Sequence, residues 1–90
     1  MHNDKSMSDR ILDGREAEYR LNDEFLNRVF DEAVETLVAN ILRAPVTDRD
    51  AVMMAKMELN GLMLVRRRLK AMLDDGILAK EAQDREEATD

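Results

Sequence analysis

The sequence contains no cysteine, so it can form neither a disulfide nor a thiolate metal site. Its single histidine, His2, stands next to the first residue, which excludes a histidine metal site or a serine–histidine triad inside a folded core. The only serines, Ser6 and Ser8, lie in the same region. There is no glycine-rich phosphate loop and no serine nucleophile motif. We therefore expect a protein that is not an enzyme and that binds no cofactor, metal or small-molecule substrate.

Aromatic residues are also scarce, at 3% of the chain with no tryptophan, and proline occurs once. Apolar residues still make up 44% of the 90 residues, which suffices for one small domain and argues against full disorder. No apolar run approaches the roughly 18–20 residues that a membrane span requires. The first residues, MHNDKSMSDR, lack the apolar middle of a signal peptide. We therefore expect a soluble cytoplasmic protein without membrane contact.

The spacing of the apolar residues predicts an all-α fold. The expected helices cover about 9–20, 23–43 and 48–75. A connection of about four residues around Pro45 makes the two long helices antiparallel neighbours, so we expect a helical hairpin with a short N-terminal helix. We interpret residues 8–80 as a single helical domain between a flexible tail at 1–7 and an acidic flexible tail at 81–90.

Capping residues and glycines set the expected helix limits. The predicted N-caps are Ser8, Asn22 and Thr47. Gly76 is expected to end the third helix in the left-handed conformation, with Ile77 folded back onto the last turn. Gly14 weakens the first helix by about 1 kcal/mol relative to alanine. Asn60-Gly61 interrupts a strong helical pattern, and we favour close helix packing there over a kink or a hinge.

The two long helices carry more apolar surface than one hairpin can bury. In the second helix apolar pairs recur every four residues, so the stripe drifts around the helix and can contact more than one neighbour. We expect the following side chains to line one face of the third helix: Val52, Ala55, Leu59, Leu62, Val65, Leu69, Met72 and Leu73. Methionines adapt to irregular gaps in a core and also form adaptable binding surfaces. The predicted protein interface comprises Phe30, Val34, Met53, Met54, Met57 and Met63.

One basic run opposes a formal net charge of −6 and an isoelectric point near 4.8. It comprises Arg66, Arg67, Arg68 and Lys70. Successive helical residues are about 100° apart, so the arginines cannot all face one phosphate track, and one of them must pack its stem near the core. We favour ion pairs of this run with Asp23 and Glu24. Phosphate or nucleic-acid contact is the alternative, although the overall charge disfavours it.

The predicted exposed face of the second helix is acidic. It carries Asp31, Glu32 and Glu35. Paired carboxylates can perform acid–base chemistry where an apolar environment makes them differ, but nothing apolar surrounds these, so we interpret them as a solvated face. A second hypothesis is that this face imitates nucleic acid and competes for a basic cleft.

The segment ILDGREAEYRLNDEFLNRVFDEAVETLVANIL, the turn with TDRDA and the segment LMLVRRRLKAMLDDGILA together resemble small helical accessory proteins of tailed bacteriophages and prophages. The resemblance covers residues 11–80 and consists of helix starts and periodicity, without a catalytic motif. The chain departs from the pattern in having no tryptophan in its long helices. The resemblance implies a phage accessory or virion-assembly context, with the host cytoplasm or the virion as location, and it assigns no functional residues.

The leading hypothesis is therefore a non-enzymatic interaction protein that self-associates and docks on a larger protein complex, either the virion or a host protein that it inhibits. The alternative is an oligomeric nucleic-acid-binding protein, such as a small DNA-packaging subunit, in which the basic run at 66–70 is repeated around a ring.

Overall fold

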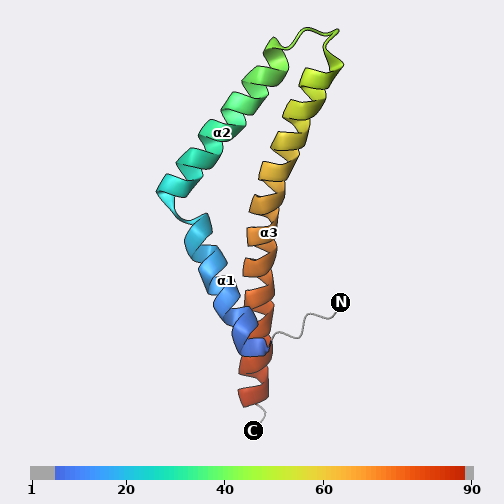
Figure 1. The fold of residues 1–90 in the computed structure, drawn as a ribbon. Coiled ribbons are helices and arrows are strands. Elements are labelled where there is room, and N and C mark those ends of the chain that lie inside the picture. Colours follow the sequence, from blue (N-terminus) through green and yellow to red (C-terminus); the bar gives the residue numbers. More distant parts are fainter. Residues whose placement is uncertain (1–5, 89–90) are drawn as a thin grey trace. The chain divides into compact units, whose positions relative to one another are not determined.

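The computed structural model describes residues 6–88, and within this range the chain forms three α-helices and no strand (Figure 1). Helix α1 spans Met7–Leu21, α2 spans Glu24–Arg43 and α3 spans Arg49–Ala88. The expected all-α fold is confirmed. The described residues form two compact units. Unit 1 consists of residues 6–22 and 68–88, and unit 2 of residues 23–67.

Each helix is preceded by a polar residue whose side chain accepts a hydrogen bond from the backbone N–H three residues later. The three bonds join Asp9 N–H to Ser6 Oγ, Leu26 N–H to Asp23 Oδ1 and Ala51 N–H to Asp48 Oδ1, each at 3.1 Å. The predicted caps Ser8, Asn22 and Thr47 were therefore wrong by one or two residues. Each helix start contains two neighbouring side chains of capping type, and the sequence does not show which of them accepts the bond.

The sequence predicted that the third helix ends at about Asp75, and this prediction was wrong. The helix continues through Gly76 to Ala88, and no described glycine has a positive φ. Residues 81–88, which were expected in an acidic flexible tail, belong to this helix, whereas residues 89–90 lie outside the described range. Of the tail expected at 1–7, Ser6 caps α1, Met7 is its first residue, and residues 1–5 lie outside the described range.

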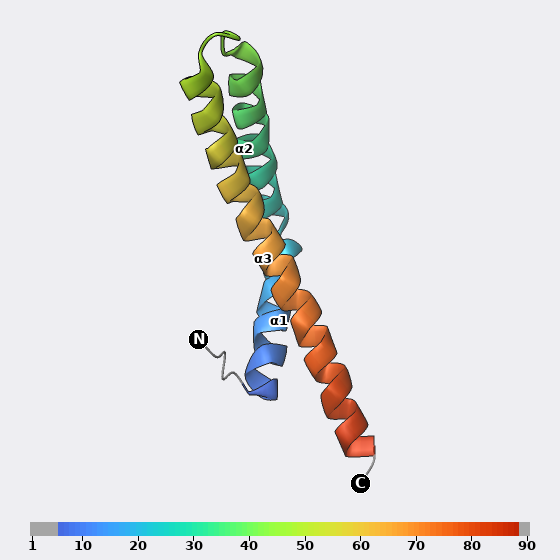
Figure 2. The ribbon, with the colours of Figure 1, turned by 90° about the vertical axis from the view of Figure 1, so that its right-hand side faces the viewer.

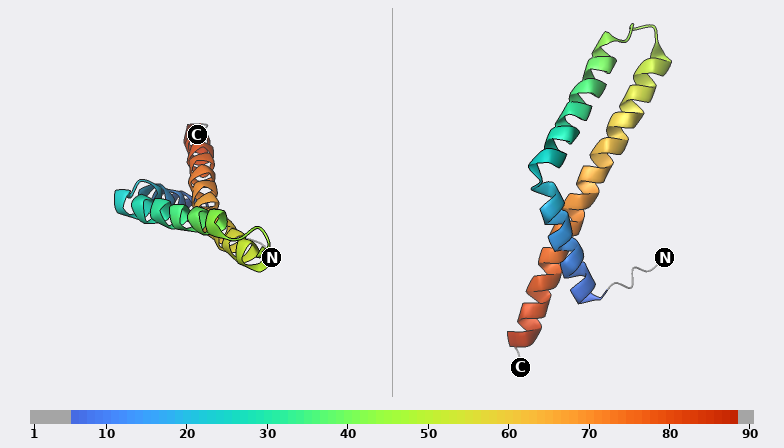
Figure 3. Two further views of the ribbon diagram at one scale, coloured as in Figure 1. Left: turned by 90° about the horizontal axis from the view of Figure 1, so that it is seen from above. Right: turned by 60° about the vertical axis from the view of Figure 1, so that its left-hand side comes forward.

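Gly76 is instead the point where α3 meets α1 in unit 1. A Cβ added at Gly76 would lie 2.7 Å from the Cα of Gly14, and one added at Gly14 would lie 2.7 Å from the Cα of Gly76. Side-chain carbon atoms do not approach backbone atoms so closely, so both positions require glycine. On the same faces Ala17 and Ala79 are only 2% and 1% exposed. The right-hand view of Figure 3 shows α1 crossing the second part of α3.

An ion pair lies beside this crossing. Arg10 donates two hydrogen bonds to Asp75, from Nη2 to Oδ1 at 2.8 Å and from Nε to Oδ2 at 3.0 Å. The hydrogen bonds and the negative charge of Asp75 raise the pKa of Arg10 above its ordinary value. The two-pronged geometry fixes the rotation of each helix at the crossing. Since both side chains are partly exposed, we assign this pair an orienting role and not a large share of the stability.

In unit 2, α2 lies beside the first part of α3, as Figures 1 and 2 show. Arg66 of α3 reaches α2, with Nη1 3.9 Å from Asp31 Oδ1 and the guanidinium 6.0 Å from the centre of the Phe30 ring. Although α2 is apolar at every turn, none of its residues is buried. The one buried hydrophobic residue that the described part of unit 2 contains is Ala55. The core of this unit is therefore thin.

Two expectations for α3 were wrong in unit 2. Val65 does not line the packed face, since it is 53% exposed, and the neighbouring Arg66 takes that position. A packed face at positions 52, 55, 59, 62 and 66 keeps a three–four spacing, and Val65 falls one residue short of it. The close approach expected at Asn60-Gly61 is also absent, because a Cβ added at Gly61 would have no atom within 4 Å other than the backbone of its own helix and its chain neighbours.

The two kinds of glycine environment predict opposite effects of the same substitution. Gly14→Ala would force a methyl group against the backbone of Gly76, and we expect it to lower the free energy of unfolding by about 1–3 kcal/mol. Gly61→Ala is the matched control. Its methyl group meets nothing within the chain, so the gain in helix propensity should stabilise the protein by up to about 1 kcal/mol.

Urea unfolding followed by circular dichroism measures both effects, with both variants and the unmodified chain at the same low protein concentration. If Gly14→Ala stabilised the chain as Gly61→Ala does, the backbone contact between α1 and α3 would be contradicted.

Candidate interaction surface

Unit 2 leaves many large apolar side chains exposed. The predicted methionines lie on this surface: Met53, Met54, Met57 and Met63 are 60%, 62%, 65% and 39% exposed. A position in a buried core, one of the two settings open to methionine, is therefore excluded for these four side chains in the isolated chain. The other two predicted interface residues, Phe30 and Val34, are half-buried on the side of α2 that contacts α3. The structure thus separates these two from the methionines.

In its first part, α3 carries two parallel stripes, each with the three–four spacing of a heptad repeat. The packed stripe consists of half-buried or buried residues on the side of α2, namely Val52, Ala55, Leu59, Leu62 and Arg66. The exposed stripe runs along another side of the helix and consists of Asp50, Met54, Met57, Gly61, Leu64 and Arg68, all of which are exposed. Met53 and Val65 flank the exposed stripe, at 60% and 53% exposure. The spacing of this second stripe is visible in the sequence, but only one apolar face of α3 was predicted.

The basic run does not form one patch. Arg66 packs its stem toward α2 and places its guanidinium on Phe30 and near Asp31, as expected of one of the three arginines. The basic run was predicted to pair with Asp23 and Glu24, but the partner of Arg66 is Asp31. The Asp23 carboxylate instead caps α2. Arg67, Arg68 and Lys70 are exposed, and within residues 6–88 none of them takes part in an ion pair.

The predicted acidic residues of α2 are all exposed. Asp31 is engaged by Arg66, and the backbone carbonyl of Glu32 accepts a hydrogen bond from the Thr36 hydroxyl at 2.9 Å. The side chains of Asp31, Glu32 and Glu35 are in contact with water. The solvated interpretation fits this arrangement, and recognition of a basic partner by this face stays a prediction.

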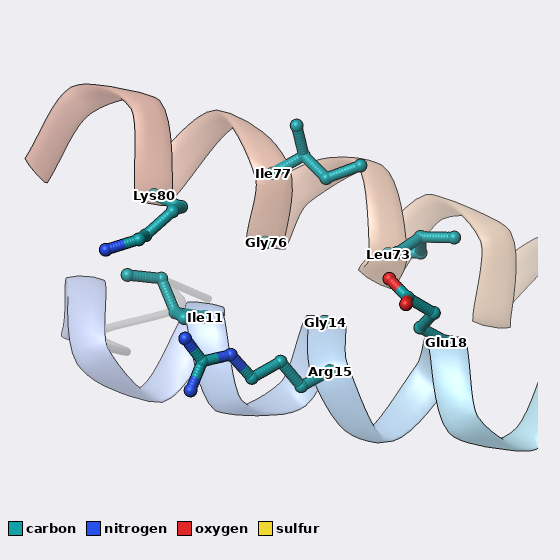
Figure 4. A pocket seen from close by; sticks show the side chains of 8 residues that line it. All are labelled: Ile11, Gly14, Arg15, Glu18, Leu73, Gly76, Ile77 and Lys80. Atoms are coloured by element: carbon teal, nitrogen blue, oxygen red, sulfur yellow. The ribbon is translucent and has the colours of Figure 1, made fainter. Parts of the chain in front are cut away.

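Unit 1 has a shallow groove of about 170 Å³ over the glycine crossing (Figure 4). Ile11 and Lys80 lie toward one end and Glu18 and Leu73 toward the other. The groove is lined by Ile11, Gly14, Arg15, Glu18, Leu73, Gly76, Ile77 and Lys80. Its charged groups are exposed, and Lys80 pairs with Asp84 at 3.1 Å. The groove lacks the convergent buried polar groups that a small-molecule site uses to orient its ligand.

A second hollow of about 330 Å³ lies at the junction of α3 with the segment before it, and it is lined by Val46, Arg49, Val52, Met53 and Lys56. Val46 is 96% exposed, so this hollow is part of the open apolar surface.

Among residues 6–88 no group of three histidine, cysteine, aspartate or glutamate side chains is placed to hold a metal ion. In the same part of the chain, no helix has the length and hydropathy needed to cross a membrane.

Comparison with known proteins gives no assignment: no family model, curated protein or solved structure matches this chain. The resemblance to phage accessory proteins therefore stays a prediction, and the surface has to be interpreted from its own chemistry.

The environment of Arg66 leads to a testable difference from its neighbour. Replacing Arg66 by alanine removes apolar stem packing, the Phe30 contact and the Asp31 pair, and we expect a loss of about 1 kcal/mol in the free energy of unfolding. Arg67→Ala is the control, because that side chain is exposed and makes no ion pair in the described chain, and its effect should stay within about 0.5 kcal/mol. Urea unfolding measures both, and equal effects would contradict a packing role for Arg66.

Proposed function

We propose that this chain is a non-enzymatic helical interaction protein that self-associates and docks on a larger protein complex. In this proposal α2 and the first part of α3 form an antiparallel hairpin whose outer apolar surface is the binding surface. The observation that carries it is the exposure of large hydrophobic side chains along both helices of unit 2, while α2 has no buried residue. Monomeric soluble proteins rarely leave large contiguous apolar patches uncovered.

The magnitude of the hydrophobic effect supports association. Full burial of a leucine or methionine side chain contributes about 1.5–3 kcal/mol. Several such side chains on α3 are about 60% exposed. Covering them together offsets the loss of translational and side-chain freedom that association entails.

The context that we propose is that of a phage accessory or virion-assembly protein acting in the host cytoplasm or in the virion. The support for it is the order of helix starts, turn and leucine–arginine helix described above, together with the surplus apolar surface. In an inhibitor version of this function, the exposed carboxylates of Asp31, Glu32 and Glu35 recognise a basic cleft of a host protein. The net charge of −6 would then steer the approach.

Light scattering coupled to size exclusion tests the self-association. We expect the mean mass to rise above that of one 10.4 kDa chain as the concentration increases from about 1 µM to about 500 µM. Because apolar burial drives association, added sulfate should raise the mass at a given concentration. A constant mass of one chain over this range, with helical circular dichroism retained, would remove self-association from the proposal.

Nucleic-acid binding is the second candidate, and the observation in its favour is that Arg67, Arg68 and Lys70 are exposed without an ion-pair partner in the described chain. Binding through these residues would weaken with salt by roughly one log unit per log of salt for each phosphate contact. We expect no binding of duplex or single-stranded DNA at about 50 mM salt, since the net charge repels it. Fluorescence anisotropy measures this, and binding that is lost on Arg68→Glu would favour the second candidate.

A further inference from the structure

We propose that the exposed stripe of α3 is the docking site for the same stripe of a second copy, with the two helices antiparallel. The inference rests on the self-association proposed above and names its surface, its orientation and its register. All residues of the exposed stripe belong to one unbroken helix, because α3 runs from Arg49 to Ala88 without interruption.

The spacing of the stripe is the first argument. Its residues at positions 50, 54, 57, 61, 64 and 68 alternate steps of four and three, which is the pattern of a helix that packs along another helix. The packed stripe of the same helix has this pattern too, and there the partner is α2. The exposed stripe is equally regular, but no helix covers it in the described chain: Met54, Met57 and Leu64 are 62%, 65% and 59% exposed.

Shape complementarity is the second argument. Two copies of the stripe can be placed antiparallel so that the two-fold axis lies at the level of residue 59 along the helix. Residue 57 of one copy then faces residue 61 of the other. Met57 then fills the space above Gly61, where an added Cβ would meet no atom within 4 Å beyond its chain neighbours and the backbone of its own helix. Met54 faces Leu64 in the same register. The two-fold symmetry repeats each contact, as it does in any isologous interface.

Charge complementarity is the third argument. In the same register Asp50 faces Arg68 of the second copy at both ends of the stripe. Neither residue takes part in an ion pair within residues 6–88, so both are available. One register therefore places the large residue over the glycine and the acid opposite the base, and no adjustment is needed to satisfy both conditions.

A parallel arrangement lacks these matches. Parallel helices in register would place Arg68 against Arg68 and Asp50 against Asp50, and the two Gly61 positions would face each other and leave a void. Like charges and voids both oppose association. The exposed stripe is thus complementary to a second copy of itself in the antiparallel orientation. For this reason we propose a second copy of the chain, and not an unrelated protein, as the binding partner.

One residue opposes the antiparallel pair. Glu58 lies beside the stripe, and in this register the two Glu58 side chains lie on the same side of the interface, close to its centre. Their repulsion is expected to weaken the dimer, so Glu58→Gln should tighten it several-fold. An interface distant from Glu58 would respond more weakly, through the change in net charge alone.

Charge reversal tests the register. Asp50→Lys alone places the introduced lysine opposite Arg68 twice, and Arg68→Glu alone places the introduced glutamate opposite Asp50 twice. Each variant should therefore dimerise roughly tenfold more weakly than the unmodified chain. In an equimolar mixture both contacts between the two variants are attractive. We expect the mixed dimer to recover a dissociation constant within about threefold of that of the unmodified chain.

Lys56→Glu is the matched control, because it changes the charge of α3 by the same amount as Arg68→Glu but lies off the stripe. It should stay within about threefold of the unmodified chain. Sedimentation velocity measures each dissociation constant, with a mass tag on one variant so that the mixed dimer is recognised. Circular dichroism establishes that each variant remains helical. A reversal that only damaged the fold would not be rescued by mixing.

The absence of cysteine allows a second, independent readout. Chains carrying Asp50→Cys, mixed with chains carrying Arg68→Cys, should form a mixed disulfide on mild oxidation. Asp50→Cys alone should not, since its two thiols would lie apart by about 27 Å, the length of helix from residue 50 to residue 68 at 1.5 Å per residue. Efficient cross-linking of Asp50→Cys to itself would overturn the antiparallel arrangement.

The outcomes separate the two proposals. Concentration-dependent association of the unmodified chain, with no rescue on mixing and no mixed disulfide, would overturn this interface and leave the self-association intact. A strict monomer at all concentrations would overturn both.

Discussion

A pair of helices can bury only the stripes that face each other, and every other apolar residue on the pair stays in water. This constraint governs both compact units, because each consists of one shorter helix and one part of α3. Unit 1 meets it with small residues, so its two backbones touch and little side-chain surface is needed between them. Unit 2 has large side chains on both of its helices and leaves much of them exposed. The functional proposal follows from this difference between the units.

The three glycines show that one residue type can have opposite structural roles. Gly14 and Gly76 permit a contact between backbones that any side chain would prevent. Gly61 faces no other helix, and it leaves an open notch in the exposed stripe of α3. From the sequence alone Gly14 was interpreted as a weak point, Gly76 as a helix end and Gly61 as the close contact. The pairing of Gly14 with Gly76 depends on a tertiary contact between residues distant in sequence, which local propensity does not contain.

The all-α class and the limits of α2 followed from periodicity and from polar residues at helix starts, and the structure agrees within one residue for α2. The end of α3 did not follow, because packing against α1 overrides the tendency of glycine to end a helix. Because successive helical residues are about 100° apart, the sequence could predict that one arginine of the basic run packs its stem near the core. Its identity as Arg66 required the register of the packed stripe, and that register also explains why Val65 points away from α2. The exposed methionines were recognised as a candidate surface, whereas their arrangement in a second heptad repeat became evident only when the packed stripe was known.

The wide sequence separation of the contacts in unit 1 has a consequence for the order of folding. Arg10 and Asp75 are 65 residues apart, whereas unit 2 is one continuous stretch whose helices are joined by the short segment 44–48. Loop-closure entropy grows with the length of chain between two contacts, so forming unit 1 from a fully unfolded chain is the costlier step. Prior formation of unit 2 shortens the effective loop, and we therefore expect the nucleus to form in the middle of the chain. The ends would then join last on folding and separate first on unfolding.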